Sequence, residues 1–156
     1  MMTAVWNIRR ALPTDVEAIC AIEQGCAEAP HWSEAVWREV LAENEGSEPA
    51  RVSLVAEGSC GIVGFVVVSC ACGVAELESV AVGEAARRQG VGRALCREAM
   101  AWSRGRAPLI ELEVRASSGG ALALYRSLDF TEQGRRAGYY RDPIEDAVLM
   151  FAPLQS

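Results

Sequence analysis

Two glycines, Gly90 and Gly92, open the segment RRQGVGRALCREAM (residues 87–100), which has the pattern of a helix preceded by arginines. The first N–H groups of a helix have no partner within it and lie at the positive end of its dipole, so they can bind a phosphate. Glycine lets the backbone approach such an anion closely. The same residues also fit a tight strand-to-helix turn with a solvated basic face, and the pattern alone leaves both interpretations open. The nearby positive charges are Arg87, Arg88 and Arg93.

The spacing of these glycines excludes two familiar phosphate-binding motifs. A dinucleotide fingerprint, G-x-G-x-x-G, needs a third glycine where this chain has Leu95. A Walker A loop needs a lysine directly after its last glycine, but Arg93 follows Gly92 here. What remains is R-x-x-G-x-G, placed between a predicted strand that ends at Val82 and a predicted helix.

A second group of chemically useful side chains lies on the strand VAELESVAV (residues 74–82). Side chains alternate between the two faces of a strand, so Glu76, Glu78, Val80 and Val82 are predicted to share one face. Either glutamate could serve as an acid–base group, or both could be surface charges.

The rest of the chain predicts the elements that position these residues. Strands are expected at residues 7–12, 51–58, 61–71, 74–82, 109–114, 131–137 and 146–154. Helices are expected from residue 13, over 31–44 with Ser33 as its cap, from 91, and over 120–128. The second helix should turn Val36, Trp37, Val40 and Leu41 inward. This order predicts one α/β domain over residues 1–156, with a mixed sheet and helices on both faces.

Composition bounds the class of protein. The chain has 156 residues and a net charge of −6, which argues against a nucleic-acid partner held by phosphate contacts. The acidic balance fits a cationic partner such as an amine or a basic peptide, and it also serves plain solubility. The longest apolar run is shorter than the ~20 residues that cross a bilayer. The first ten residues show no apolar signal segment. We therefore expect a cytoplasmic protein without a membrane partner.

Six cysteines raise the question of a metal or of disulfides. There is no C-x-x-C pair and His31 is the one histidine, so no metal site is expected. Without a signal segment, disulfides are not expected either. Most of the thiols are predicted to be small core residues, with Cys70 and Cys72 on the same face of a strand. A cysteine nucleophile with His31 as its base is a further alternative.

The segment SVAVGEAARRQGVGRAL (residues 79–95) resembles the acetyl-CoA-binding motif Q/R-x-x-G-x-G/A of the GNAT acetyltransferases. The segments IELEVRASSGGALALYRSLDF and GYYRDPIEDAVLM resemble the second half of the RimI-type enzymes, the ribosomal-protein-alanine N-acetyltransferases. CAEAPHWSEAVW stands where that subfamily carries its proline–tryptophan–serine segment. The resemblance covers almost the whole chain and implies the GNAT fold, a single mixed, mostly antiparallel sheet of about seven strands flanked by four helices.

The resemblance also implies an activity, which is transfer of an acetyl group from acetyl-CoA to a primary amine. The implied acceptor is the N-terminal α-amine of a protein or peptide, with a ribosomal protein as one candidate. A small-molecule amine acetyltransferase and a non-catalytic acyl-CoA-binding module are the alternatives. The implied assembly is a monomer or a weak dimer.

Site roles carry over position by position from the resemblance. Glu113 matches the general base and Tyr125 the general acid, while some members of the superfamily take their base from the position of Glu76. Asp129 and Gly138 depart from the usual pattern, which has glycine at the first position and asparagine at the second. The implied cofactor contacts are Val80, Ala81, Val82, Arg87, Arg88, Gln89, Gly90, Val91, Gly92, Arg93 and Ser118, where Ser118 replaces an asparagine. The implied acceptor contacts are Trp32, Glu76, Tyr139 and Tyr140.

Overall fold

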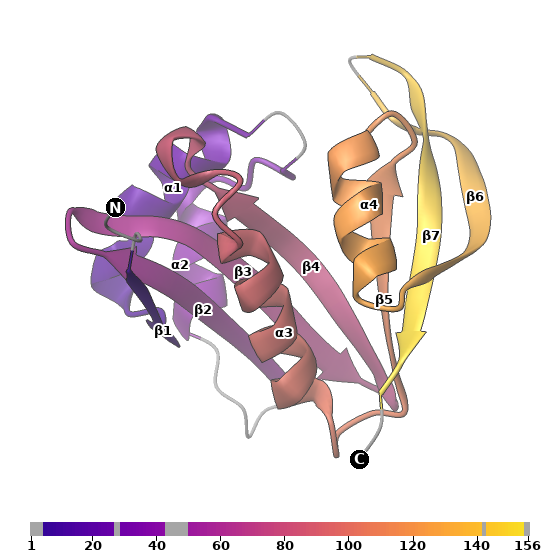
Figure 1. Ribbon diagram of the computed structural model, residues 1–156, viewed down its shortest axis with the longest axis horizontal. Helices are drawn as coiled ribbons and strands as arrows, with labels where there is room; N and C mark the ends of the chain where they lie inside the picture. The colour runs from indigo at the N-terminus through magenta and orange to yellow at the C-terminus, as the bar shows by residue number, and fades with distance from the viewer. Residues whose placement is uncertain (1–4, 27–28, 43–49, 142, 155–156) are drawn as a thin grey trace.

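The chain folds around one seven-stranded sheet with the order β1-β2-β3-β4-β5-β7-β6 (Figure 1). The computed structural model describes residues 5–26, 29–42, 50–141 and 143–154. All neighbouring strands run antiparallel except β4 and β5, which are parallel. The prediction of a mixed, mostly antiparallel sheet is thereby confirmed. The strands are β1 (Trp6–Arg10), β2 (Ala50–Gly58), β3 (Gly61–Ala71), β4 (Val74–Val82), β5 (Leu109–Arg115), β6 (Thr131–Tyr140) and β7 (Glu145–Pro153).

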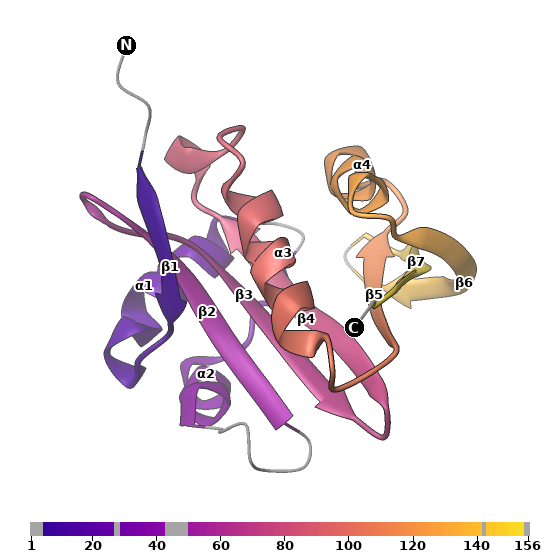
Figure 2. The same ribbon diagram turned by 60° about the horizontal axis from the view of Figure 1, so that its bottom comes forward.

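The four α-helices cover opposite faces of this sheet (Figure 2). Each face has its own apolar core, because side chains alternate along each strand. On one face, Trp37 is fully buried and its ring meets Phe65 edge-on at a centroid distance of 5.0 Å. The helices are α1 (Val16–Gln24) and α2 (Glu34–Ala42) on that face, and α3 (Val91–Ser103) and α4 (Gly119–Ser127) on the other. Single 3-10 turns, η1 (Pro13–Asp15) and η2 (Glu84–Ala86), precede α1 and α3.

The start of α2 follows the sequence prediction and its inward face does so only in part. The Ser33 hydroxyl accepts a hydrogen bond from the Val36 N–H at 3.2 Å, which confirms the predicted cap. Trp37 and Val40 are buried, whereas Val36 is exposed. The prediction for Val36 was wrong because it precedes Trp37 by one position, about 100° around the helix. Residues 43 and 44 of the predicted helix lie outside the described residues.

A β-bulge in β4 overturns the prediction that Glu76, Glu78, Val80 and Val82 share one face. Val67 of β3 pairs with Ser79 and Val68 pairs with Leu77, so Glu78 is an extra residue in the ladder. The insertion reverses the alternation: Leu77 and Val80 both pack into the core beneath α3 and α4. Glu76 therefore faces the side of α1 and α2, opposite Val80 and Val82. Alternation counted straight through the strand cannot detect the extra residue.

β4 and β5 pair for only a short distance. The ladder joins Ala75 to Ile110 and Glu76 to Glu111, and no later pair follows among the described residues. The two strands then diverge toward their carboxyl ends (Figure 1). An opening in the middle of a sheet is unusual because it leaves backbone groups without strand partners. Backbone groups that are left unpaired at this divergence are available to a bound molecule.

The prediction that most of the thiols are core residues holds for four of them, which are buried or packed against a core, and fails for Cys60 and Cys72. Cys70 and Cys96 are buried, but Cys60 and Cys72 are exposed and Cys20 is half-buried, as is Cys26. Cys72 lies after the end of β3 with a φ of 53°, so it does not share a strand face with Cys70. All six thiols are free. Within the described residues no group of side chains is arranged to hold a metal ion, and no helix is both long and apolar enough to span a membrane.

The end of α4 forms a Schellman motif around Asp129, the residue that replaces the usual glycine. The Phe130 N–H donates to Tyr125 O at 3.0 Å and the Asp129 N–H donates to Arg126 O at 3.1 Å. The Phe130 ring also contacts the Tyr125 ring at a centroid distance of 5.7 Å. Asp129 has a φ of 71°, where glycine is favoured and aspartate is among the better tolerated residues. The departure from the family pattern therefore keeps the turn and adds strain.

We predict that Asp129→Gly raises the free energy of unfolding by about 1 kcal/mol, because glycine removes the strain of the left-handed backbone. Removing a negative charge from the carboxyl end of α4 acts in the same direction. Urea denaturation measures the change. Asp129→Asn, which removes the charge and tolerates the same φ, is the control. A loss of stability in the glycine variant would mean that the aspartate side chain stabilises the turn.

Candidate active site

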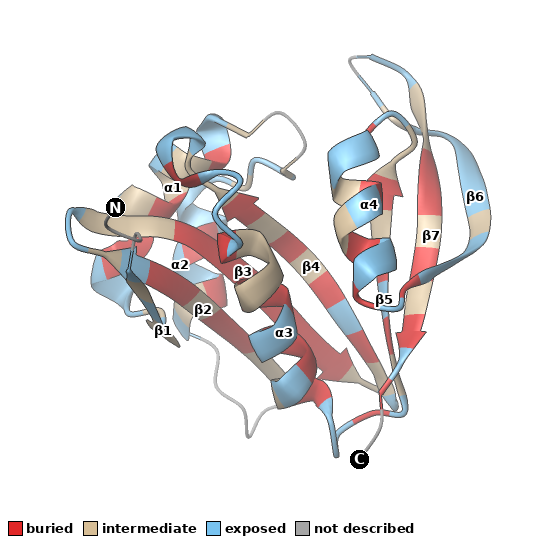
Figure 3. Cartoon of the chain, in the orientation of Figure 1, coloured by how far each residue is buried: buried red, intermediate tan, exposed pale blue. Residues whose placement is uncertain are grey.

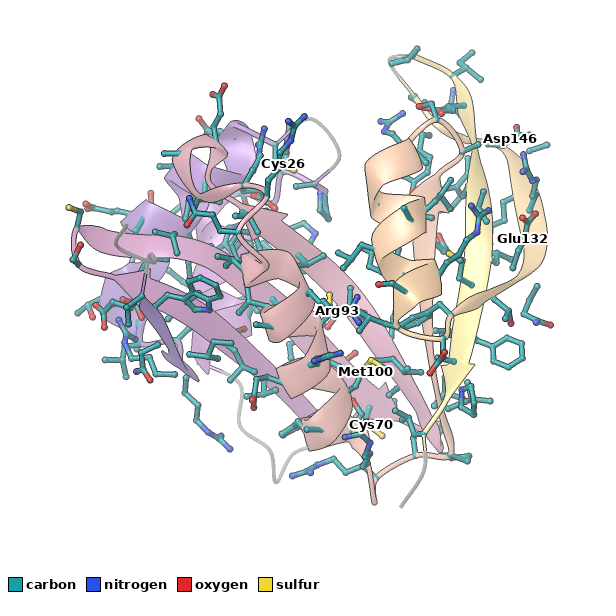
Figure 4. The ribbon with its side chains drawn as sticks, viewed as in Figure 1. Cys26, Cys70, Arg93, Met100, Glu132 and Asp146 are labelled. Atoms are coloured by element: carbon teal, nitrogen blue, oxygen red, sulfur yellow. The ribbon has the colours of Figure 1, made fainter. Side chains whose placement is uncertain are left out.

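A cavity of about 810 Å³ occupies the divergence of β4 and β5. Its walls come from both faces of the sheet. Arg93, Leu124 and Tyr125 contribute from α3 and α4 on one side, and Cys26 and Pro30 contribute from the segment after α1 on the other. Figure 4 shows Cys26 at the end of α1 and Arg93 between α3 and α4. Figure 3 shows buried residues along the strands that border the divergence. The cavity therefore reaches both faces of the sheet.

The amino end of α3 forms the floor of one side of this cavity. Gly90 precedes the helix with a φ of 83° and no side chain caps it. The first helical hydrogen bond runs from the Ala94 N–H to Gly90 O at 3.0 Å, so the N–H groups of the three residues before Ala94 have no partner within the helix. These groups fit the phosphate cradle that the sequence indicates. We call this feature the cradle; it consists of residues 90–93.

Most of the predicted cofactor contacts line the cavity, but two do not. Gln89 turns away and donates its side-chain N–H to Ala85 O at 3.3 Å. Ser118 is buried before α4, and its hydroxyl has no hydrogen-bond partner among the described residues. Neither residue belongs to the cavity wall. The predicted contacts that line the cavity are Val80, Ala81, Val82, Arg87, Arg88, Gly90, Val91, Gly92 and Arg93.

Two of the three arginines near the cradle bind other parts of the protein. The Arg87 guanidinium donates to Val82 O at 3.1 Å and to Gly25 O at 3.3 Å. Arg93 donates to the Ser127 hydroxyl, which links the start of α3 to the end of α4. The sequence analysis had assigned these arginines to cofactor contacts alone. The structure shows instead that these side chains also hold the cavity walls together.

Glu113 lies on the acceptor-side wall, which we define as the part of the cavity on the face of α1 and α2. Its neighbours Leu112 and Val114 pack into the opposite core, so alternation turns Glu113 away from α4. Its side chain is 27% exposed and lies 3.4 Å from the Arg136 guanidinium. A hydrogen bond from the Tyr139 hydroxyl to Glu113, together with the negative charge of Glu113, raises the pKa of Tyr139. A carboxylate held this way can accept a proton from a bound amine.

Tyr125 lies on the other side of β5. It projects from α4, is 7% exposed and lines the same cavity. The Schellman motif and the Phe130 contact fix its ring at the end of the helix. The two predicted acid–base residues are therefore brought to one cavity from opposite faces of the sheet. The sequence could not reveal this placement because it depends on the divergence of the strands.

The two glutamates of β4 have different surroundings. Glu78 forms a bidentate ion pair with Arg51, with contacts of 2.7 and 2.9 Å. This pair gives the Glu78 carboxylate a structural role. Glu76 lines the cavity. Its pKa is raised because neighbouring protein atoms displace water from its carboxyl group, and because Glu78, Glu111 and Glu113 lie nearby. Glu76 and Glu78 both line the cavity with Glu113, and the ion pair with Arg51 sets Glu78 apart from the other two.

The paired tyrosines lie at the mouth of the acceptor-side wall. Gly138 has a φ of 60°, and its N–H donates to the Asp146 side chain at 3.0 Å. Asparagine also tolerates this backbone region, which explains why either residue precedes the tyrosines. Tyr139 is 49% exposed, whereas burial raises the pKa of Tyr140 to about 12.

Arg115 and Arg136 are two charged residues of the site that the sequence analysis missed. Arg115 packs over the Tyr140 ring at 4.4 Å and also contacts Glu145 at 3.4 Å. Arg136 contacts Glu113 and packs over Tyr139. Both belong to basic positions that look like solvated charges in the sequence. Trp32, by contrast, was predicted to contact the acceptor but is not among the residues that line the cavity, and its ring packs at a tilt against Trp37 with a centroid distance of 4.9 Å.

Comparisons with known proteins agree with this architecture. The family model for the acetyltransferase (GNAT) family matches residues 16–130. The [ribosomal protein bS18]-alanine N-acetyltransferase of Escherichia coli (strain K12) is 37% identical over 145 residues, which cover 90% of this chain and 93% of that protein. The crystal structure of the E. coli ribosomal-protein-S18-alanine N-acetyltransferase superposes with a TM-score of 0.82 and 30% identity, covering 97% and 96% of the two chains.

A structure of Arabidopsis thaliana NAA60 in complex with acetyl-CoA shares the fold, with a TM-score of 0.86 at 19% identity. The superposition covers 97% of this chain and 100% of that one.

We predict that Gly92→Val weakens acetyl-CoA binding at least tenfold, whereas Gly92→Ala binds about as well as the wild type. A Cβ at Gly92 would meet Val82 at 3.5 Å and Leu124 at 3.7 Å, which are ordinary contacts, so alanine fits. Valine adds two methyl groups next to the cradle and should keep a phosphate from the backbone N–H groups. Calorimetry measures both affinities, with urea denaturation as a check on folding. Equal affinity in both variants would mean that Gly92 serves only the turn and is not needed for a phosphate to approach the cradle.

Proposed function

This chain belongs to the GNAT family of acetyltransferases, and we propose that its acceptor is the N-terminal α-amine of a protein, with a ribosomal protein as the substrate. The chain is an acetyl-CoA-dependent N-acetyltransferase of the RimI type. The observation that carries the proposed acceptor is the acceptor-side wall, where Glu113, Tyr139 and Tyr140 stand on the face of the sheet opposite α3 and α4. The similarity to the E. coli alanine N-acetyltransferase over 90% of the chain supports the same acceptor class.

On the donor side, the residues present fit acetyl-CoA. The N–H groups of the cradle would hold its pyrophosphate, and the β4 backbone at Val80–Val82 would contact its pantetheine arm. Bound acetyl-CoA supplies the thioester from which the acetyl group is transferred. The hydroxyl of Tyr125, fixed at the end of α4, holds a proton on this side of the cavity for the departing sulfur.

On the acceptor side, the chain must remove a proton and keep the amine in place. An amine that arrives protonated is not a nucleophile, so a base has to accept a proton before attack. We assign this role to Glu113, whose side chain is kept in position by Arg136 and Tyr139. Glu76 adds negative charge on the same wall and favours a cationic group there.

We propose that the enzyme works in the cytoplasm, where ribosomal proteins are made. We further propose that it is a monomer or a weak dimer. It needs no nucleic-acid partner. The overall charge of −6 supports this because phosphate contacts would require a basic surface.

We predict that Glu113→Gln lowers kcat by ~10²–10⁴-fold and leaves the acetyl-CoA affinity nearly unchanged, since the amide keeps the shape of the side chain but accepts no proton. Steady-state kinetics and calorimetry measure the two quantities. Glu76→Gln is the matched control, because it removes a carboxylate from the same wall and should have a mild effect. The reverse pattern, a crippled Glu76 variant beside a near-normal Glu113 variant, would place the base on β4.

We predict that a short peptide with a free N-terminal alanine is acetylated faster than the same peptide with a blocked N-terminus and an internal lysine. An α-amine has a lower pKa than a lysine side chain, so Glu113 can deprotonate it more readily. The assay follows release of coenzyme A with both peptides, with polyamines and with free amino acids. Preference for lysine, or activity with polyamines alone, would contradict the proposed acceptor and leave the family membership intact.

A further inference from the structure

We propose that Arg87 is a positioning residue that couples occupation of the cradle to the order of the acceptor-side wall. The coupling would connect the two faces of the sheet, and only its last test rests on the acceptor proposed above.

One side chain joins three segments of the chain. Arg87 itself lies in the loop between η2 and the cradle. Its Nε donates to the carbonyl of Val82, the last residue of β4, at 3.1 Å. Its Nη2 donates to the carbonyl of Gly25, the residue that ends α1, at 3.3 Å. The guanidinium therefore fastens the donor-side loop to the end of α1, on the other face of the sheet.

The point of attachment leads directly into the acceptor-side wall. Cys26 follows Gly25 and lines the cavity, as do Ala29 and Pro30. The Cys26 carbonyl accepts hydrogen bonds from His31 Nε2 at 2.7 Å and from the Ala29 N–H at 3.2 Å. Figure 4 shows Cys26 beside the loop that precedes α3. A restraint on Gly25 is thus transmitted to the residues that border the acceptor.

The direction of the effect follows from the position of the loop. An anion held by the cradle N–H groups restricts the loop that carries Arg87. The guanidinium then remains against the two carbonyls for a larger fraction of the time, and the end of α1 loses mobility. Binding on one face that orders residues on the other gives positive coupling without a change of fold.

Arg88 offers a matched comparison. It is the next residue, it carries the same charge, and it lines the same cavity. Its side chain makes no hydrogen bond or ion pair with the described residues, and its φ is 64°. If charge near the phosphate were all that mattered, the two arginines would be equivalent. The bridge to Gly25 is what distinguishes Arg87.

Hydrogen exchange with coenzyme A as the probe tests the coupling. In the wild type, saturating coenzyme A should slow exchange of the Gly25 and Cys26 amides by about fivefold or more, in addition to protecting the cradle. In Arg87→Ala, saturating coenzyme A should protect the cradle but no longer the two amides. Arg88→Ala should need more coenzyme A and then protect both regions. Protection of the two amides in Arg87→Ala equal to that in the wild type would overturn the proposal, as would its absence in the wild type.

Acceptor affinity provides the functional measurement. Coenzyme A should tighten binding of a peptide with an N-terminal alanine by about fivefold in the wild type, and this gain should disappear in Arg87→Ala. Arg87→Gln, which keeps an N–H donor but cannot reach both carbonyls, should restore part of it. A full gain in Arg87→Ala would refute the coupling. If the peptide binds none of the variants, the proposed acceptor is wrong, and the exchange experiment still decides the role of Arg87.

Discussion

The separation of β4 from β5 is the constraint on which the rest of the site depends. Two parallel strands that remained paired would seal the sheet and isolate α3 and α4 from the acceptor-side wall. Their ladder stops after Glu76 and Glu111, and a cavity of about 810 Å³ takes its place. The bulge at Glu78 contributes to the same arrangement. Because of it, each later residue of β4 faces the side of the sheet opposite to the one that strict alternation predicts. Chemistry can then take place within the plane of the sheet, with each substrate approaching from its own side.

Charge is distributed unequally across this opening. The donor side offers helix N–H groups and arginines, whereas the acceptor side pairs Glu113 with Arg136 and holds Glu76 beside other carboxylates. An anionic cofactor would meet positive charge on the donor side, and a cationic amine would meet these carboxylates on the acceptor side. The arginines serve a second purpose, since Arg87 and Arg93 hydrogen bond to neighbouring segments and hold the cavity walls in place. The net charge of the chain, considered alone, conceals this local arrangement.

The sequence was sufficient for the order of the elements, because strand alternation, helix caps and turn residues are local signals. It also identified the residues of the cradle, because a glycine motif is recognised from its spacing. It failed on β4, where one extra residue puts Glu76 on the opposite face from Val80 and Val82 and leaves no mark in the pattern. The sequence did not identify Arg136 for another reason. Arg136 lies on β6, whereas its partner Glu113 lies on β5, and these two strands are not adjacent in the sheet. Such long-range pairings follow from the assembled sheet.

A structure with a bisubstrate analogue, in which coenzyme A is joined to the N-terminus of an alanine peptide, tests the central claim most directly. The account predicts that the coenzyme A part lies between α3 and α4 with its pyrophosphate on the cradle. The peptide should lie on the opposite face, against Tyr139 and Tyr140, and the covalent link should pass between β4 and β5. Density for both parts on the same face of the sheet, or a link that bypasses the divergence, would contradict it.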